Sequence, residues 1–407
     1  MMFNNQNIVC AVEFGTSKIC VLIGQLEING KVKLLGYEAV PSSNAVVKGE
    51  ISDMKRVVEA LRKAFDNAEK KSNCDLSHCR VITVVVTGGG IDSTQEIAGI
   101  TVNTPNGIVT ENEKRIVTEG ARNLALTNGK EIINLCPSCF TIDKRRVSEP
   151  CGQSGKYLEA DVHVVSANCR RLNPFIQALR ETGFEDVDVE PVFAPLADVN
   201  GSVDEETHEP GFILLDIGAG TTEYLLNIDD GIRASGVVRI GMDHAANDLA
   251  IGLSLPIDQC RRFFTSGSLA EAIRNKQEFI EVQVRPRHVR KIPVSSCESI
   301  VDARLHELMS IVYSKVSANF NLNTLGAGGL LTGGGALYAP VKDIFSSVFD
   351  ISCRTVVPRN TRCGALENPR FSSVWGALTL APDFVDHPVQ DSKLQQFLKF
   401  FNRDRRG

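Results

Sequence analysis

The stretch Phe212-Ile-Leu-Leu-Asp-Ile-Gly-Ala-Gly-Thr-Thr-Glu223 decides the fold of this chain. Its apolar start, Phe212 to Leu215, predicts a buried strand that runs into a tight turn. Gly218 and Gly220 have no Cβ atom, so backbone amides there can approach an anion closely. Asp216 stands where the strand ends and can hold a hydrated Mg²⁺ ion. The stretch therefore predicts a phosphate-binding hairpin, and an ordinary tight turn is the alternative.

Two further glycine turns support the phosphate-binding interpretation. Near the start of the chain, the apolar strand Val9 to Val12 runs into Glu13-Phe-Gly-Thr-Ser-Lys18, which supplies a carboxylate, a glycine turn, hydroxyls and a cation. Later, Thr332-Gly-Gly-Gly-Ala336 precedes a helix-like stretch from Ala339 to Phe349 and suits a nucleotide that lies against bare backbone. Three such loops in this order predict a duplicated α/β nucleotide clamp.

With these loops the sequence resembles the actin, Hsp70 and sugar-kinase superfamily and, within it, the FtsA family of bacterial cell-division proteins. Gly241-Met-Asp-His244 and Asn247-Asp-Leu-Ala-Ile-Gly-Leu253 are similar to the family's stretch after the second phosphate loop, and Ile300-Val-Asp-Ala-Arg304 to the start of a later helix. The similarity extends over nearly the whole chain. It implies an α/β, actin-like (ribonuclease H-like) duplicated two-domain fold with an FtsA-type inserted subdomain and a C-terminal amphipathic helix.

The resemblance and the order of the predicted elements divide the chain into segments. They are 1–86 (domain I core, first part), 87–165 (inserted subdomain), 166–200 (domain I core, second part, with a hinge helix within 186–199), 201–230 (domain II core, first part), 231–305 (smaller subdomain of domain II), 306–362 (domain II core, second part), 363–381 (return helix to domain I), 382–391 (flexible tether of little helical propensity) and 392–407 (membrane-binding amphipathic helix). Apolar positions at helical spacing also predict a helix from Asp53 to about Lys70, and Trp375 is expected in the core.

The resemblance implies ATP and Mg²⁺ as ligands of the three loops. Asp216 is expected to hold the metal, with Glu13 acting through water. No activated nucleophile or strong general base accompanies these motifs, so we expect no catalytic residue and at most slow ATP hydrolysis, with the nucleotide acting as an assembly ligand. The predicted nucleotide-binding residues are Gly15, Thr16, Ser17, Lys18, Asp216, Gly218, Ala219, Gly220, Thr221, Thr222, Gly241, Arg261, Gly333, Gly334 and Gly335.

Four positions depart from the family pattern at this site. Glu13 and Glu223 stand where the family has Asp, and the longer side chain would move each carboxylate. Arg261 and Phe264 stand where the family commonly offers Glu and Lys toward the adenosine. Loss of a ribose partner would weaken ATP binding, although these two side chains could make substitute contacts.

The resemblance also implies partners. In the family, the division tubulin FtsZ presents an acidic, partly helical C-terminal peptide to the smaller subdomain, and the insert contributes to contacts between subunits and with later division proteins. A basic run lies in this subdomain, and a solvated face is its alternative interpretation. The run consists of Arg285, Arg287, His288, Arg290 and Lys291. Because Arg304 matches an arginine of the family's docking region, the expected partner-binding residues are Arg290, Lys291 and Arg304.

The end of the chain has the pattern of a membrane-surface helix. Leu394, Phe397, Leu398 and Phe401 recur at helical spacing and form one apolar stripe. Each basic residue beside an anionic lipid surface contributes about 1 kcal/mol, so binding should be reversible and strengthened by self-association. The basic residues are Lys393, Lys399, Arg403, Arg405 and Arg406. A terminal helix that packs back on the body is the alternative.

Composition limits the remaining possibilities. The formal net charge of −5 gives no reason to expect a nucleic-acid surface. No apolar run reaches the roughly 18 residues of a spanning helix, and the N-terminus lacks the pattern of a signal peptide. The twelve cysteines are therefore expected as reduced thiols, and Cys136 and Cys139 lack the second pair that a zinc site needs.

The sequence therefore predicts a cell-division protein on the cytoplasmic face of the bacterial inner membrane, at the division site, that binds ATP, self-associates and anchors FtsZ. Three alternatives remain open. A PilM-like pilus assembly protein would share the fold and insertion but would not need the C-terminal helix. A small-molecule kinase of the superfamily would transfer phosphate to a sugar or acid, and a nucleotide-free scaffold would bind no ATP.

Overall fold

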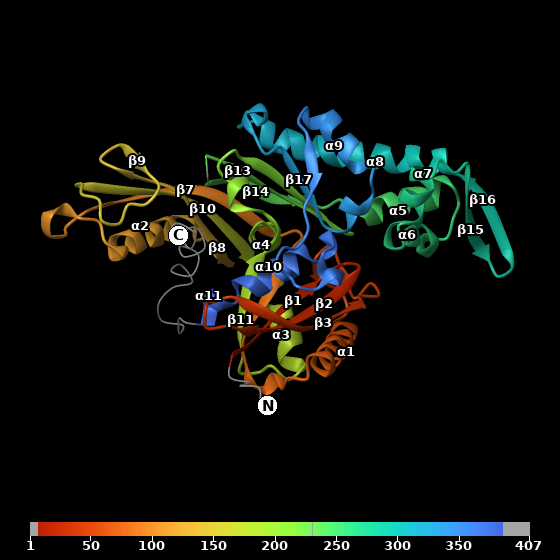
Figure 1. Cartoon of the computed structure of the whole chain (residues 1–407), viewed down its shortest axis with the longest axis horizontal. Coiled ribbons are helices and arrows are strands. Elements are labelled where there is room, and N and C mark those ends of the chain that lie inside the picture. The colour runs from red at the N-terminus through yellow and green to blue at the C-terminus, as the bar shows by residue number, and fades with distance from the viewer. Residues whose placement is uncertain (1–6, 230, 386–407) are drawn as a thin grey trace.

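Two five-stranded sheets with the same pairing pattern form the centre of the molecule (Figure 1). The computed structural model describes residues 7–229 and 231–385. The first sheet, in spatial order, contains β3 (Val32–Pro41), β2 (Lys18–Leu26), β1 (Ile8–Phe14), β6 (Cys79–Val86) and β11 (Asp188–Phe193); the second contains β14 (Gly231–Val238), β13 (Thr222–Ile228), β12 (Phe212–Ile217), β17 (Gly329–Thr332) and β18 (Cys353–Thr355).

The two sheets repeat one topology. β1 pairs antiparallel with β2 and parallel with β6, and β12 pairs in the same way with β13 and β17. Each sheet thus begins with one of the two predicted hairpins and continues with parallel strands. The predicted duplication is confirmed.

Helices cover both faces of the first sheet. Every second residue of β1, starting at Ile8, packs against α1 (Met54–Ser72) and α3 (Cys169–Glu181). The intervening residues pack against α4 (Ala194–Ser202) and α10 (Ser372–Leu380). Burial on both faces explains why the strand is an unbroken apolar run rather than an alternating one.

Two predictions for these helices are confirmed. The helix expected from Asp53 to about Lys70 is α1, and the Asp53 side chain caps it by accepting a hydrogen bond from Arg56 N. Trp375 lies in the core, with 2 % of its surface exposed, and its indole N–H donates to the carbonyl of Arg359 at 2.9 Å.

The second sheet is covered by α8 (Val294–Ser317) and α9 (Val341–Phe349) on one face and by α4 on the other. Figure 1 shows α4 and α10 between the two sheets. A smaller helical unit extends from this half, and the β15–β16 hairpin projects from it at one end of the molecule. Its elements are α5 (Met242–Gly252), α6 (Ile257–Thr265), α7 (Ser268–Arg274), β15 (Phe279–Arg285) and β16 (His288–Pro293).

The insertion forms a sheet of its own at the opposite end of the molecule (Figure 1). Its spatial order is β7 (Ile91–Thr101), β10 (Tyr157–Asn168), β8 (Lys130–Ile142) and β9 (Arg145–Val147), and α2 (Glu111–Ala125) packs on it. No strand was expected at β7, because its central residues, Asp92 to Glu96, are polar. The residues of β8 and β10 next to the second sheet belong to the same apolar cluster as that sheet, so the insertion rests on both halves.

The structure corrects three predictions. The segment 186–199 is not one hinge helix, because Asp188–Phe193 forms β11 before α4 begins. Ile300 lies within α8 and does not start a helix, so the boundary placed at 305 falls inside this helix. The chain after Ala381 forms the helical turn α11 (Pro382–Val385) where a tether of little helical propensity was expected.

Candidate nucleotide-binding site

The two predicted phosphate hairpins have the same internal geometry. Gly15 N donates to Lys18 O at 2.8 Å, and Gly218 N donates to Thr221 O at 2.9 Å. These hydrogen bonds fix each turn and do not involve the amides at the turn centres, 16–17 and 219–220. The two turns face each other closely, because a Cβ atom at Gly220 would lie 2.5 Å from Thr16 Oγ1.

A cavity of about 500 Å³ opens between the hairpins, a size typical of small-molecule sites. The predicted residues that line it are Gly15, Thr16, Ser17, Lys18, Asp216, Gly218, Ala219, Gly220, Thr221, Arg261, Gly333, Gly334 and Gly335, together with Glu13, Glu223 and Phe264. Sequence positions far apart thus converge on one space.

Two predicted residues lie elsewhere. Thr222 is fully buried, and its hydroxyl donates to Ile240 O at 2.8 Å, away from the cavity. Gly241 lies behind the second hairpin, where a Cβ atom would come within 2.6 Å of the carbonyl oxygens of Gly218 and Ala219. Gly241 therefore supports the loop by close packing and is not among the described residues that line the cavity.

Several lining residues were missed by the sequence analysis. They are Ala39, Val40, Pro41, Ser42, Ser43, Asn44, Thr87, Met242, Asp243, Asp258, Thr265, Arg370 and Ser373. Arg370 comes from η8 (Pro369–Phe371), before the return helix, and donates to the carbonyls of Phe264 and Thr265 at 3.2 and 3.0 Å. It therefore ties the end of α6 to the first half of the molecule. No local sequence signal marks a contact of this kind.

The third glycine loop packs directly on Asp216, the aspartate that was predicted to hold a metal ion. Gly333 has φ +78°, and a Cβ atom there would lie 2.1 Å from Asp216 Oδ1. Gly335 is similarly close to Ile217, at 2.3 Å from its Cγ2. Only glycine fits at these positions, so the glycine run brings bare backbone to the end of β12.

The floor of the cavity concentrates carboxylates around a single lysine. Lys18 Nζ lies 2.5 Å from Glu13 Oε2, and both side chains are largely buried. Burial alone would lower the pKa of Lys18, but the charge of Glu13, its hydrogen bond and the charges of the other neighbouring groups together outweigh burial and raise the pKa. Burial and then the charge of Glu13 raise the pKa of Asp216 to about 6, and burial and then the charge of Asp216 raise the pKa of Glu223 to about 8. These groups therefore favour a bound cation.

Asp198, on α4, adds a carboxylate behind this cluster. It is fully buried, and neither carboxylate oxygen has a hydrogen-bond partner of normal geometry among the described residues. Burial and the charge of Asp216 raise its pKa well above the ordinary value. The sequence analysis assigned it only to a hinge helix.

The described residues fit a nucleotide with a hydrated Mg²⁺ ion. Glu13 and Asp216 offer the oxygen ligands that Mg²⁺ prefers, and the glycines at the turns leave room for phosphate oxygens beside backbone amides. Lys18 supplies a cation at the same place. This donor set favours the phosphate-binding interpretation of the hairpins over ordinary tight turns.

The wall formed by α6 carries the two unusual residues. Arg261 lies 3.4 Å from Asp243 and 3.7 Å from Asp258, distances that leave its guanidinium weakly held. Phe264 contacts Tyr338 edge to face, with ring centroids 6.2 Å apart. Both line the cavity, so the departures from the family pattern fall inside the site.

Two of the predicted docking residues, Arg290 and Lys291, lie on β16 of the smaller helical unit, and Arg304 lies on α8. Arg304 is already held by its own chain, with Nε 2.6 Å and Nη2 3.1 Å from the carboxylate of Asp248, and it also contacts Glu307. Arg290 donates to the carbonyls of Leu253 and Ser254. Lys291 is exposed on β16, as are the other basic residues of the β15–β16 hairpin, Arg285, Arg287 and His288. Among the described residues, most basic side chains of the β15–β16 hairpin are thus exposed to solvent, whereas Arg304 is paired with Asp248.

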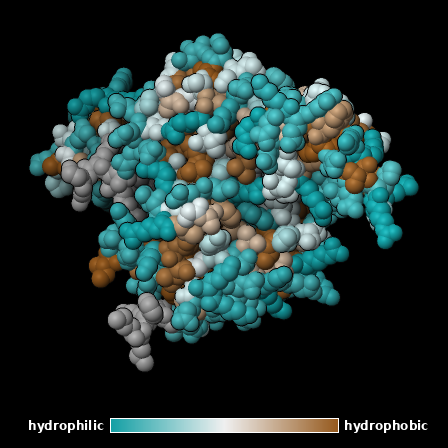
Figure 2. Space-filling model, turned by 45° about the vertical axis from the view of Figure 1, so that its right-hand side comes forward, coloured by the Kyte–Doolittle hydropathy of each residue, from teal (hydrophilic) through white to brown (hydrophobic). Residues whose placement is uncertain are grey.

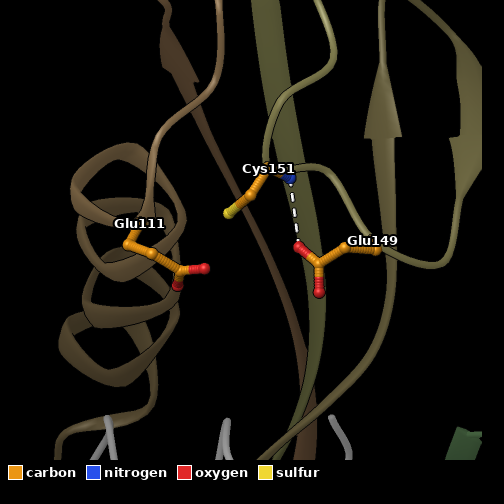
Figure 3. Close-up of side chains that lie close together, drawn as sticks. All are labelled: Glu111, Glu149 and Cys151. Carbon is orange, nitrogen blue, oxygen red and sulfur yellow. Dashed lines mark hydrogen bonds between the residues drawn. The ribbon is translucent and has the colours of Figure 1, made fainter. Parts of the chain in front are cut away.

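The insertion contains one group of potential metal ligands, shown in Figure 3. Among the described residues, ligand atoms of Glu111, Glu149 and Cys151 lie within 4.8 Å of one another. Lys114, with 1 % of its side chain exposed, already binds both oxygens of Glu149 at 3.0 and 2.8 Å. Burial and Glu111 raise the pKa of Cys151. The group therefore forms a closed polar network, and we assign it a structural role.

The cysteines and the predicted membrane segment were also the subject of predictions. All twelve cysteines are free thiols; Cys136 is buried, and Cys139 Sγ lies 4.0 Å from a carboxylate oxygen of Asp161. In the part of the chain that the structure describes, no helix has the length and apolar character to cross a membrane. The face shown in Figure 2 is mainly hydrophilic, with small scattered hydrophobic patches. The predicted membrane helix at 392–407 lies outside the described residues.

Sequence comparisons agree with this arrangement. The family description "SHS2 domain inserted in FTSA" matches residues 88–166, which contain the sheet of the insertion, and "Cell division protein FtsA" matches residues 213–376. The chain belongs to the FtsA family. The cell division protein FtsA of Borreliella burgdorferi is 25 % identical over 380 residues, which cover 91 % of this chain and 90 % of the relative. FtsA of Escherichia coli K12 is 24 % identical over 386 residues, covering 92 % and 90 %.

Solved structures show the fold of the FtsA family in more distant proteins. A PilM–PilN type IV pilus biogenesis complex has a chain with a TM-score of 0.62 at 15 % identity, covering 93 % of this chain and 99 % of that chain. MreB5 of Spiroplasma citri bound to ADP gives a TM-score of 0.52 at 12 % identity, covering 94 % and 100 %. These likenesses establish the predicted actin-like fold, and the family match identifies a cell-division protein.

Proposed function

We propose that this FtsA-family chain is a nucleotide-binding tether that self-associates and anchors the division tubulin FtsZ to the cytoplasmic face of the inner membrane at the division site. The single observation that carries the nucleotide assignment is the cavity of about 500 Å³ in which the two hairpins and the third glycine loop meet. Family membership supports the roles in division and in anchoring.

ATP would lie with its phosphates between the hairpin turns. The turn amides at 16–17 and 219–220 would contact phosphate oxygens, and Lys18 would offset part of their charge. Asp216 would hold the hydrated Mg²⁺, with Glu13 acting through water. Bound Mg²⁺ would neutralise the polyphosphate beside the buried carboxylates. No activated nucleophile stands among the described residues that line the cavity, and we propose the nucleotide as a ligand for assembly, hydrolysed slowly at most.

The adenosine would lie toward α6. There Phe264 offers a ring, and the weakly held guanidinium of Arg261 offers hydrogen-bond donors to the ribose or base. These contacts would replace the Glu and Lys of the family pattern.

Partners would bind outside the cavity. Arg290 and Lys291 on β16 of the smaller unit, together with Arg304 on α8, would form the FtsZ docking region, where the exposed basic hairpin suits an acidic peptide. The insertion would contact neighbouring subunits and later division proteins. The membrane segment would use Leu394, Phe397, Leu398 and Phe401 with the surrounding basic residues, and self-association would strengthen its binding by avidity.

Isothermal titration with ATP and Mg²⁺ tests the nucleotide assignment. We expect binding by the unaltered chain and a loss of at least tenfold in affinity for Lys18→Met, since removing this cation leaves the carboxylates and phosphates unbalanced. Lys63→Met, an exposed position on α1, is the matched control. Absence of heat with the unaltered chain would favour the nucleotide-free scaffold. Phosphate transfer from ATP to a sugar or acid would favour the kinase.

Flotation of FtsZ with lipid vesicles tests the tether. Full-length protein should carry FtsZ to the lipid fraction, and protein truncated after Val389 should not. If FtsZ stays behind while the full-length protein floats alone, the partner assignment fails.

A further inference from the structure

The buried carboxylate of Glu223 links the nucleotide cavity to the start of the insertion. Glu223 lines the cavity, and 1 % of its surface is exposed. It stands on β13 opposite Asp216 of β12, so its backbone is fixed within the second phosphate hairpin. Its Oε1 accepts a hydrogen bond from Gly88 N at 2.9 Å. Gly88 belongs to the first half of the molecule and begins the residues matched to the inserted domain.

Gly88 lies in a tightly packed junction. It has φ +84°, and a Cβ atom there would lie 2.2 Å from Lys48 O. On the other side of Lys48, a Cβ atom at Gly220 would lie 3.0 Å from its Cα, and Lys48 N donates to Thr16 Oγ1 at 3.1 Å. The loop between β4 (Val46–Val47) and β5 (Glu50–Ile51) therefore packs against both phosphate hairpins and against the entry to the insertion.

The exit from the insertion meets the same loop. Asn168 N donates to Gly90 O at 3.0 Å, so the two connecting segments lie side by side. Arg171 follows the exit, and its Nη2 donates to the carbonyls of Gly49 and Thr87 at 2.5 and 3.3 Å. Its Nη1 lies 2.8 Å from Glu50 Oε1. Both connections of the insertion are thus held within one hydrogen-bonded junction.

The far part of the insertion rests on the second half of the molecule through buried polar contacts. His163 on β10 contacts Ser235 Oγ of β14 at 2.8 Å, and Arg233 lies 2.7 Å from Asp161. Ser138 on β8 donates to Ile232 O at 2.6 Å. The insertion is thus fixed both at the junction and along this seam with β14.

We infer that Glu223 is a positioning residue that couples occupancy of the cavity to the order of the junction, residues 86–91 and 168–171, and so to the insertion. A nucleotide with its cation between the hairpins orders the Glu223 carboxylate and presses Gly220 and Thr16 against Lys48. Both effects hold Gly88 more firmly. The inference rests on the proposed nucleotide function, and it adds the residue through which the ligand acts on the insertion.

Two substitutions separate the carboxyl group of Glu223 from its reach. Glu223→Asp keeps a carboxyl group but shortens the side chain by one methylene, about 1.5 Å, which takes the carboxyl oxygens out of hydrogen-bond range of Gly88 N. Glu223→Gln removes the ionisable group but keeps an oxygen that can accept from Gly88 N. Neither change adds volume at this buried position.

Hydrogen–deuterium exchange of the full-length protein tests the coupling, with each variant measured without ligand and at a saturating MgATP concentration found by calorimetry. In the unaltered chain and in Glu223→Gln, MgATP should slow exchange at 86–91 by roughly fivefold, the effect of one hydrogen bond. In Glu223→Asp this slowing should be absent. Peptides from α9, residues 341–349, report any general stabilisation.

The outcomes are distinct. Calorimetry without heat for the unaltered chain overturns the proposed nucleotide function and the coupling together. Binding without a change of exchange at 86–91 overturns only the coupling. Equal slowing in Glu223→Asp and in the unaltered chain overturns the role of Glu223.

Discussion

Replacing Glu223 by Gln should make the protein less sensitive to alkaline pH. The folded protein raises the pKa of Glu223 from 4.5 to about 8, chiefly through burial and then through the charge of Asp216. Near neutral pH the folded state therefore holds a proton that the unfolded state has released. The free energy of unfolding is highest below about pH 4.5 and falls as the pH rises to about 8, where this contribution is lost.

The size of the effect follows from the shift. Each pKa unit corresponds to about 1.4 kcal/mol, so ionised Glu223 costs on the order of 3–5 kcal/mol in the absence of a cation. Glutamine has no proton to lose and still accepts the hydrogen bond from Gly88 N. At pH 8 the variant should be more stable than the unaltered chain by a few kcal/mol, and at pH 5 the two should be similar. Asp216, with a pKa of about 6, leaves a smaller dependence at lower pH.

Urea denaturation at pH 5, 6.5 and 8 measures this difference. The sequence contains one tryptophan, Trp375, and its buried position in α10 makes its fluorescence a direct probe of unfolding. EDTA keeps divalent cations from masking the carboxylates. If Glu223→Gln lost stability between pH 6.5 and 8 as steeply as the unaltered chain, the assignment of the titration to Glu223 would be wrong.

Three further changes follow from single contacts. Gly333→Ala should weaken MgATP binding in calorimetry and lower the free energy of unfolding in urea by about 1–3 kcal/mol. The reason is that Gly333 has a φ of +78° and that a Cβ atom there would clash with a carboxylate oxygen of Asp216. Unchanged affinity for MgATP would contradict this. Arg304→Ala should lower the free energy of unfolding by roughly 1 kcal/mol, since Asp248 loses its partner. Lys291→Glu, at an exposed position, should weaken FtsZ binding and leave the free energy of unfolding unchanged. Equal stability of the two variants would argue against the ion pair between Arg304 and Asp248. Lys114→Met should lower the free energy of unfolding by about 2 kcal/mol, because Glu149 loses its main partner. The double variant Lys114→Met with Glu149→Gln should recover most of this loss. No recovery in the double variant would contradict the pairing.

The features that sequence analysis predicted well are those encoded locally. Each hairpin combines a strand that is apolar on both faces with a glycine turn, and this pattern fixes both the strand and its return. The amphipathic pattern of α1 likewise fixed its length within two residues. Both kinds of signal depend on neighbours in the sequence.

Other features depend on contacts between distant segments. The segment Val189-Glu-Pro-Val-Phe193 is short, and a segment of this length cannot be assigned to a strand or a helix from periodicity alone. β7 is an edge strand whose central residues, Asp92 to Glu96, are polar on both faces, so no alternation of polar and apolar residues marks it. Arg370 and Asp198 reach the site only because α4 and α10 pack between the sheets. Thr222 begins the return strand of the second hairpin, and the pleat of β13 directs its side chain away from the cavity. Gly241 packs behind the turn of the same hairpin and therefore does not reach the cavity.

Vesicle flotation with FtsZ tests the central claim most directly. The full-length protein, a version truncated after Val389 and Lys291→Glu would each be mixed with FtsZ and vesicles that contain anionic lipid. The account predicts that the unaltered full-length protein carries FtsZ to the lipid fraction and that the truncated protein stays with FtsZ in the soluble fraction. Lys291→Glu should float but carry less FtsZ than the unaltered protein. Flotation of FtsZ by the truncated protein, or failure of the full-length protein to float, would contradict it.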